Sequence, residues 1–501
     1  MWCYIFYFIV LLDSVLMNDV FKETFAYRKN ILQKELHMML GNDVVLSDNE
    51  EKANNIIMEL KRREIDYAFD NPQYFNFSKH FFEYKDEVKR SKLFKAIQRM
   101  PKGAVLHVHD TGILSPDYIL SLTYLDDLYV CFYENNVKFL FSLETPLSSC
   151  NTKWQLMKSA RFSSGNVKEF DADLRRHFTI VIDDPHLVHR DINAVWNDFQ
   201  QVFITTSGML CYRPVWEQYF YDTLRSLRDD NVMYLEFRSV LPSLYDLDGT
   251  VFDEIETVRS YKKVLDRFMA DHPDFYGAKL IYAPLRNVDL NTVKHYLNVT
   301  KRIREEFPEF LAGFDLVGQE DLGAPTKDFM EILSDSMDEI DYFFHAGESN
   351  WYGTSSDENL ADAIALNTRR IGHAFAIAKH PLLMEEIRKK DIAIEVNVVS
   401  NAVLKLVSDV RNHPLAIFLA NNLPVVLSSD DPGIWEAEPL SHDFYVTFVG
   451  VASRHADLKL LKKLAINSLV YSTYHNKDKI VHEFEIRWTK YIDSVIRDEF
   501  Q

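Results

Sequence analysis

Eight short apolar runs recur between residues 104 and 428, and amphipathic segments separate most of them. Each run is four to seven residues long, which is typical of a strand rather than a helix. Because strands that alternate with helices form a parallel sheet, eight such units predict an α/β fold closed as a (β/α)₈ TIM barrel. The expected strands are 104–108, 232–237, 278–282, 311–317, 342–345, 370–373, 392–396 and 424–428.

The length and charge of the chain limit what it can bind. Its 501 residues leave room for a barrel of about 250 residues and for added segments. The formal net charge of −19 argues against a nucleic-acid partner, since such binding depends on Lys and Arg neutralising phosphates. We therefore expect a small neutral or cationic ligand and no nucleic acid.

The first residues, MWCYIFYFIVLLDSVLM, contain an apolar run over 2–12 that is too short to span a bilayer. This run predicts a secretory signal over residues 1–17, and hence a secreted, extracellular protein. The alternative is a buried N-terminal helix. No later stretch has the length of a membrane span, so we expect no stable membrane insertion.

Residues 18–98 have a helical pattern. Ser47 and Glu50 form a capping box before an apolar stripe at helical spacing, and a second amphipathic run covers 81–97. Because these helices precede the first site strand, they form a segment added to the barrel, which itself occupies 99–501. They suit pairing of two chains, and simple packing against the barrel is the alternative.

Residues 125–195 are rich in turn residues and predict an insertion after the first barrel strand, with its own small fold. Cys131 and Cys150 lie close enough in this stretch to close a loop in an oxidising compartment, which leaves Cys211 as a buried thiol. The insertion is either a partner-binding module or a lid. Sequons at Asn76 and Asn298 agree with export.

Several of the expected strands end in histidine or acidic residues. His107 and His109 stand two residues apart, so both side chains leave the same face of a strand and can reach one ion. His345 ends the fifth strand, and Asp430 follows the eighth. A barrel brings these strand ends to one rim, so the four residues predict a catalytic zinc-type site with one position open to water. The ion would lower the pKa of that water.

Three further residues suit the chemistry of such a site. Glu348 follows His345 across a small-residue turn and suits general acid work, while His373 can orient the hydroxide or take its proton. Asp431 would face a ring nitrogen of the substrate. For each single residue the alternative is a hydrogen-bonded core side chain, and Asp430 and Asp431 also suit a helix cap.

Taken together, the segments MPKGAVLHVHD, GFDLVGQED, FFHAGE, RIGHAF, NAVLKLVSDVRNHP and SSDDP resemble the metal-dependent adenosine deaminases, whose barrel is of the amidohydrolase type. The signal-like start, N-terminal helices and Cys-bearing insertion resemble the secreted adenosine deaminase growth factor branch, the type-2 enzymes. This resemblance implies hydrolysis of adenosine and deoxyadenosine to inosine, deoxyinosine and ammonia. In that branch the N-terminal helices mediate homodimer formation, and the insertion is implicated in binding a receptor or glycan.

The resemblance also implies a role for each site residue. Zinc is expected on His107, His109, His345 and Asp430. Glu348 is expected to protonate purine N1, and His373 to steer the attacking hydroxide. The implied substrate contacts are Asp431 with N7, the Gly318 amide with N3, and Asp110 and Trp196 with the ribose side.

The chain departs from the family pattern at three places. Ala374 stands where the family usually has Gly, Asn397-Val398-Val399 replaces a Cys-Pro-containing step, and Leu285 occupies a loop position that is often polar. None of these changes removes a predicted metal ligand or the acid, so they bear on efficiency and sugar preference. The base-flipping zinc deaminases are excluded because no C-x-x-C occurs.

Two other functions compete with adenosine deamination. The added helices and the insertion suit an extracellular signalling or binding protein whose barrel is only a scaffold. A barrel amidohydrolase that acts on another amino-purine is the second alternative. The acidic balance and the lack of a Gly-rich phosphate loop count against AMP as its substrate.

Overall fold

The computed structural model describes residues 2–134 and 136–497, with side chains from residue 19 onward. Its centre is a ring of eight parallel strands, which confirms the predicted barrel. The first half is a four-stranded sheet in the order β1 (Gly103–Val105), β5 (Val232–Ser239), β8 (Ala278–Tyr282) and β9 (Leu311–Phe314). The second is a four-stranded sheet in the order β10 (His345–Ala346), β11 (Arg370–His373), β12 (Ala393–Val396) and β13 (Val425–Leu427).

Two isolated parallel bridges close the ring. Phe314 pairs with Tyr342 between the two halves, and Val108 pairs with Asp430 beyond β1 and β13. The expected first strand, 104–108, ends earlier at Val105, because the Leu106 N–H donates to the side-chain hydroxyl of Ser428 (3.3 Å) rather than to a backbone carbonyl of a neighbouring strand. The second bridge joins two segments that carry predicted site residues.

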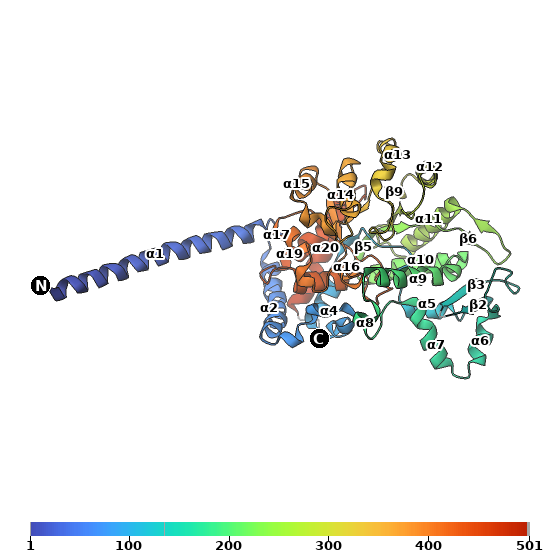
Figure 1. The fold of residues 1–501 in the computed structure, drawn as a ribbon, viewed down its shortest axis with the longest axis horizontal. Coiled ribbons are helices and arrows are strands. Elements are labelled where there is room, and N and C mark those ends of the chain that lie inside the picture. Colours follow the sequence, from blue (N-terminus) through green and yellow to red (C-terminus); the bar gives the residue numbers. More distant parts are fainter. Residues whose placement is uncertain (1, 135, 498–501) are drawn as a thin grey trace.

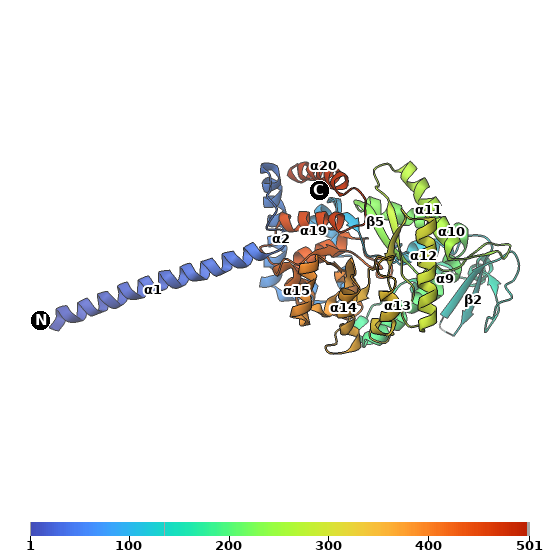
Figure 2. The same ribbon diagram turned by 90° about the horizontal axis from the view of Figure 1, so that it is seen from above.

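Helices surround the strands (Figure 2). Those that follow barrel strands or close the chain are α10 (Arg213–Asp229), α11 (Glu254–Asp271), α12 (Leu290–Glu306), α13 (Met330–Ser334), α14 (Ser355–Ala365), α15 (Pro381–Lys390), α16 (Val398–Val403), α17 (Leu415–Ala420), α18 (Ser441–Val446), the π-helix η8 (Thr447–Val451), α19 (Leu458–Val470) and α20 (Lys477–Ile496). Short 3₁₀ segments are η1 (Pro72–Tyr74), η2 (Asn76–Ser78), η3 (Val88–Arg90), η4 (Arg176–Phe178), η5 (Thr326–Phe329), η6 (Phe375–Lys379) and η7 (Val410–Asn412). One large apolar cluster joins these helices to the strands.

Figure 1 shows α1 (Trp2–Met38) extending away from the body of the protein. The predicted secretory signal, 1–17, is helical from Trp2 onward, while residue 1 and the side chains of 2–18 lie outside the described part of the chain. Among the helices that the structure describes, none combines the length and apolar character needed to cross a membrane.

The next helices pack against the barrel. α2 (Asp48–Asp70) begins with the predicted capping box, in which Ser47 and Glu50 bond each other's backbone N–H groups. The expected helix over 81–97 is divided into α3 (Phe81–Tyr84) and α4 (Lys92–Arg99). The division occurs because Ser91 is extended and accepts a hydrogen bond from the Phe94 N–H, which starts a new helix.

The insertion forms a separate layer beside the barrel (Figure 1). A three-stranded antiparallel sheet has the order β3 (Asn136–Phe141), β2 (Leu128–Tyr133) and β4 (Gln155–Leu156). The accompanying helices are α5 (Pro116–Leu122), α6 (Met157–Ser163), α7 (Val167–Arg175), α8 (Pro185–Val188) and α9 (Ile192–Leu210), and the short strands β6 (Leu244–Tyr245) and β7 (Val251–Phe252) form a hairpin after β5. The predicted disulfide between Cys131 and Cys150 is present, with a Cα–Cα distance of 6.0 Å. Cys211 is free, as expected, but half-buried rather than fully buried.

Candidate active site

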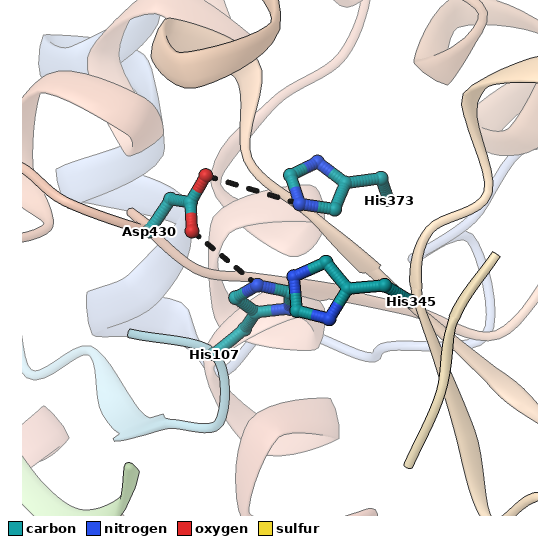
Figure 3. Close-up of side chains that lie close together, drawn as sticks. All are labelled: His107, His345, His373 and Asp430. Carbon is teal, nitrogen blue, oxygen red and sulfur yellow. Dashed lines mark ion pairs between the residues drawn. The ribbon is translucent and has the colours of Figure 1, made fainter. Parts of the chain in front are cut away.

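Four side chains converge at the carboxyl ends of the barrel strands. Each of His107, His345, His373 and Asp430 offers one ligand atom, and these atoms lie within 4.8 Å of one another. Figure 3 shows the three rings and the carboxylate turned toward one another. All four are buried, with at most 4% of each residue exposed. The barrel therefore gathers groups that lie more than 300 residues apart in the sequence.

His109 belongs to a second, overlapping group. Its Nε2 lies 3.1 Å from Asp430 Oδ1, and the same oxygen lies 3.4 Å from His107 Nε2. Among the described residues, His109, Asp430 and Asp431 form this second possible metal group. The structure thus brings together all four predicted ligands, and it adds the imidazole of His373 near the same point.

The donor atoms fit a cation. Asp430 Oδ1, His107 Nε2 and His373 Nε2 are buried, and each has no hydrogen-bond partner among the described residues. Burial opposes ionisation of Asp430, yet the imidazoles of His107 and His109 hold its pKa well below its usual range. A carboxylate beside imidazole nitrogens is a zinc donor set, and the unpaired buried atoms are what a bound ion would satisfy.

Carboxylates behind the rim orient two of the imidazoles. His345 Nδ1 lies 2.6 Å from Asp315 Oδ2, and His107 Nδ1 lies 2.8 Å from Glu395 Oε2. Each contact directs the opposite ring nitrogen, Nε2, toward the site. Burial lowers the pKa of His345 to about 3, although Asp315 opposes this shift, so the ring is neutral and suited to a metal.

Two arginines connect these carboxylates through the centre of the barrel. Arg238 donates to Asp315 (2.7 Å) and to Glu395 (2.8 Å), and Arg370 donates to Glu395 (2.6 Å) and to Glu236 (2.7 Å). All five side chains are buried. The sequence interpretation missed them, although each is a charged residue within or directly after an apolar strand, and that pattern is the signal that identifies them.

Glu348 is held beside the site by a second acidic residue that the sequence interpretation also missed. The Glu320 carboxylate accepts the backbone N–H groups of Glu348 (2.6 Å) and Gly347 (2.9 Å). Gly347 has φ +70°, so the turn between His345 and Glu348 uses the small residue as expected. Burial raises the pKa of Glu348 well above its usual range, and the nearby Asp430 and Glu320 add to the shift. This environment favours the protonated carboxyl group that a general acid needs.

Asp431 also lies in the site. Its Oδ1 is buried without a hydrogen-bond partner among the described residues. Burial, together with the charge of Asp430, raises the pKa of Asp431 well above its usual range. Gly112 packs so closely that a Cβ there would come 1.9 Å from Asp431 Oδ1. This carboxyl group is therefore available to a ligand and is confined on one side.

The remaining predicted substrate contacts have mixed surroundings. Asp110 is buried and accepts hydrogen bonds from the Tyr261 hydroxyl and the Thr111 N–H. Trp196 lies in α9, only 8% exposed, with its ring edge-on to Phe199. Gly318 has φ +110° and lies beside Leu285. The contacts of these residues with a sugar or base remain predictions.

The three departures noted in the sequence have clear structural settings. Ala374 has φ 45° and follows His373, at φ 60°, so both residues take the left-handed conformation that favours glycine. Asn397 precedes α16 and is buried, with neither side-chain polar atom hydrogen-bonded within the described residues. Leu285 is 56% exposed.

Comparison with known proteins agrees with this geometry. The adenosine deaminase family model matches residues 181–484, and the adenosine/AMP deaminase N-terminal model matches residues 5–97. An adenosine deaminase of Phlebotomus duboscqi is 43% identical over 94% of this chain and 93% of its own length. Adenosine deaminase 2 of Homo sapiens is 42% identical, with 93% of each chain covered. Among solved structures, Arabidopsis ADAL complexed with IMP shares the fold, with a TM-score of 0.57 at 16% identity over 79% of this chain and 99% of that one. The chain therefore belongs to the adenosine deaminase family, within its type-2 branch.

Proposed function

We propose that this protein is a zinc-dependent deaminase that hydrolyses adenosine and 2′-deoxyadenosine to inosine, deoxyinosine and ammonia. The observation that carries this proposal is the buried Glu348 carboxyl group beside a group of imidazoles and a carboxylate whose donor atoms are unpaired among the described residues. The names of the relatives support adenosine as the substrate.

His107, His109, His345 and Asp430 would hold the zinc ion. Two of the imidazoles are oriented by Glu395 and Asp315, and the soft nitrogen donors favour zinc over magnesium or calcium. Bound there, the ion would supply Lewis acidity that makes a water molecule nucleophilic at neutral pH.

The residues of the chain would then act on the purine ring. Glu348 donates its proton to N1, which makes C6 electrophilic as water adds. The Asp431 carboxyl group, whose protonated form is favoured by burial, donates to N7, which is only an acceptor. The Gly318 N–H bonds N3, while Asp110 and Trp196 face the ribose. His373 orients the water, which adds its oxygen to C6 and gives one proton to the 6-amino group, and cleavage of the C6–N bond then releases ammonia.

The test begins with purified protein, its metal content and its rates on adenosine, deoxyadenosine and AMP. We expect about one zinc per chain, ammonia release from both nucleosides, loss of activity with a chelator and recovery with zinc. Faster reaction with AMP would assign the site to nucleotides instead.

The acid role has its own test. Glu348→Gln should lower kcat by about 10²–10⁴-fold, since the amide has no acidic proton, while zinc content stays unchanged. Glu358→Gln is the matched control, because Glu358 lies on α14 with its side chain 57% exposed. Full activity in Glu348→Gln would reject the proposed acid.

Export and assembly complete the proposal. We place the protein outside the cell after removal of a signal within residues 1–17, with glycans on Asn76 and Asn298. Asn76 is half-buried and Asn298 is exposed on α12. Secretion from an expressing cell, and a mass decrease on glycosidase treatment, test these assignments.

Helix α1 suits pairing of two copies as a homodimer. Beyond residue 18 it exposes several large apolar side chains in a region that extends from the body (Figure 1): Val20, Phe21, Phe25, Tyr27, Ile31, Leu32 and Leu36. Exposed apolar patches of this kind mark interaction sites. The molar mass in solution of the natural chain, compared with a Phe21→Ser, Phe25→Ser, Leu32→Ser variant, tests the pairing, and an unchanged mass would reject it.

The insertion supports a second activity. It exposes Leu143, Leu147 and Phe162 around its disulfide-linked sheet, a surface suited to a cell-surface receptor or glycan. Growth-factor activity that depends on this surface should persist in Glu348→Gln, whereas activity that depends on adenosine removal should disappear with it.

A further inference from the structure

A buried chain of hydrogen bonds leads from α17 to His373. The Leu415 backbone N–H donates to His413 Nδ1 (3.0 Å), and His413 Nε2 lies 2.9 Å from Asn401 Oδ1. Asn401 Nδ2 then lies 3.0 Å from His373 Nδ1. The three side chains are at most 2% exposed, so these contacts face no competition from bulk solvent.

The direction of every bond in this chain follows from its first member. A backbone N–H can only donate, so His413 Nδ1 must be the bare acceptor nitrogen. Burial lowers the pKa of His413 to about 3, so the ring is neutral and carries its proton on Nε2. That proton is donated to Asn401 Oδ1, which leaves the Asn401 amide N–H to donate to His373 Nδ1. The neutral His373 ring then carries its own proton on Nε2.

The reverse arrangement fails. If the Asn401 amide were turned so that its oxygen faced His373, its NH₂ group would face His413 Nε2. His413 would then need two bare nitrogens at once, which a neutral imidazole does not have. Glu348 Oε1 also lies 3.5 Å from His373 Nδ1, and a protonated carboxyl group, which the acid role requires, is compatible with a bare nitrogen.

We propose that Asn401 and His413 are positioning residues that fix the proton of His373 on Nε2, so that His373 faces the site as a hydrogen-bond donor and not as a metal ligand. This inference rests on the zinc site of the proposed function. A nitrogen that carries a proton has no lone pair for a metal, so His373 cannot be a ligand although it lies in the buried group of four. His109 then takes its place as the fourth zinc ligand. His373 Nε2 lies 3.8 Å from Asp430 Oδ2, so its N–H would face the metal-ligating carboxylate.

Neutron diffraction of the zinc-loaded full chain reads the proton positions directly. We expect deuterium on Nε2 of both His373 and His413, and none on Nδ1 of either ring. Deuterium on His373 Nδ1, or zinc bonded to His373 Nε2, would overturn the proposal. Absence of deamination by the same zinc-loaded protein would reject the proposed function, but the proton positions on His373 and His413 would still test this inference.

Variants test the consequence for the reaction. Asn401→Asp keeps the shape and the bond from His413 but replaces the donor toward His373 with an acceptor, which moves the His373 proton to Nδ1. We expect kcat to fall by about 10–100-fold, as for other residues that orient a site residue from behind, with KM unchanged because the fully buried Asn401 acts only through His373. Unchanged kcat would overturn the proposal.

Two variants that introduce no charge test the same inference in case Asn401→Asp does not fold. His413→Gln retains an N–H donor toward Asn401 Oδ1 and should keep kcat near the natural value. His413→Leu removes that donor, lets the Asn401 amide turn, and should lower kcat with KM and zinc content retained. Equal kcat in the two variants would contradict the proposed chain of hydrogen bonds. If His413 had a purely structural role, the presence or absence of an N–H donor at this position would not change kcat.

Discussion

Asp315 accepts two hydrogen bonds from the single residue His345, one from the backbone N–H to Oδ1 (2.8 Å) and one from the ring Nδ1 to Oδ2 (2.6 Å). Arg238 donates to the same Oδ2 (2.7 Å). The main chain and the side chain of His345 are therefore fixed by one carboxylate on the neighbouring strand segment. This contact prevents rotation of the ring and keeps Nε2 directed into the site.

Asp315→Asn should weaken zinc binding by about 10–100-fold. The amide has one oxygen and one NH₂ group in place of the two carboxylate oxygens. Its NH₂ group would therefore face a donor in either orientation, namely the His345 ring and Arg238 or the His345 backbone N–H. Competition against a chelator of known zinc affinity measures the change. Asp341→Asn is the control, because Asp341 makes a surface ion pair with Arg369 and its side chain is 48% exposed. Equal zinc affinity in the two variants would show that Asp315 does not support the metal site.

Asp443→Asn should reduce the pH dependence of stability in the metal-free protein. Burial raises the pKa of Asp443 from 3.8 to about 8, against the effect of its bond from the Val399 N–H. The unfolded chain releases this proton near pH 4, whereas the folded chain holds it, so Asp443 contributes stability at low pH that is lost as pH rises from about 4 through about 8.

The amide that replaces the Asp443 carboxyl group cannot ionise, so the thermal midpoint of the variant should fall less steeply across that pH window. Asp335→Asn, at an exposed position after α13, is the control and should follow the natural chain. Parallel curves for Asp443→Asn and the natural chain would contradict the assignment.

Ala374→Gly should stabilise the fold by about 1 kcal/mol. At φ 45° the Cβ of alanine makes the left-handed conformation unfavourable, whereas glycine has no Cβ and adopts it freely. Ala376→Gly is the matched control two residues away, where φ is not positive, and it should destabilise by about 1 kcal/mol. Denaturant midpoints compare the two, and a destabilised Ala374→Gly variant would show that the left-handed turn is not strained.

Replacing both Cys131 and Cys150 by Ser should loosen the insertion and leave the barrel intact. The bridge closes a loop over a separation of 19 residues, and loss of such a bridge costs about 3 kcal/mol. Hydrogen exchange should quicken in β2, β3 and β4, while exchange in β11 and β12 and the value of kcat remain unchanged. Slow exchange preserved in β2 would mean that packing alone holds the small sheet.

Local patterns predicted much of this molecule. The candidate site could be predicted from the apolar runs that carry or precede His107, His109, His345 and Asp430, because a barrel brings strand ends to one rim. The capping box could be predicted because Ser47 and Glu50, which bond each other's backbone N–H groups, are only three residues apart. The prediction of one helix over 81–97 was wrong, because the Ser91 cap competes locally with a continuous apolar stripe.

The amino-acid sequence by itself determined the eightfold alternation, the metal-type residues at the strand ends and the resemblance that names the family. Only the tertiary structure decided which groups orient them: Asp315 and Glu395 behind two imidazoles, and Asn401 and His413 behind a third. Strand and helix patterns arise between near neighbours in the chain, whereas hydrogen bonds of this kind join residues up to 288 positions apart and exist only once the barrel has closed.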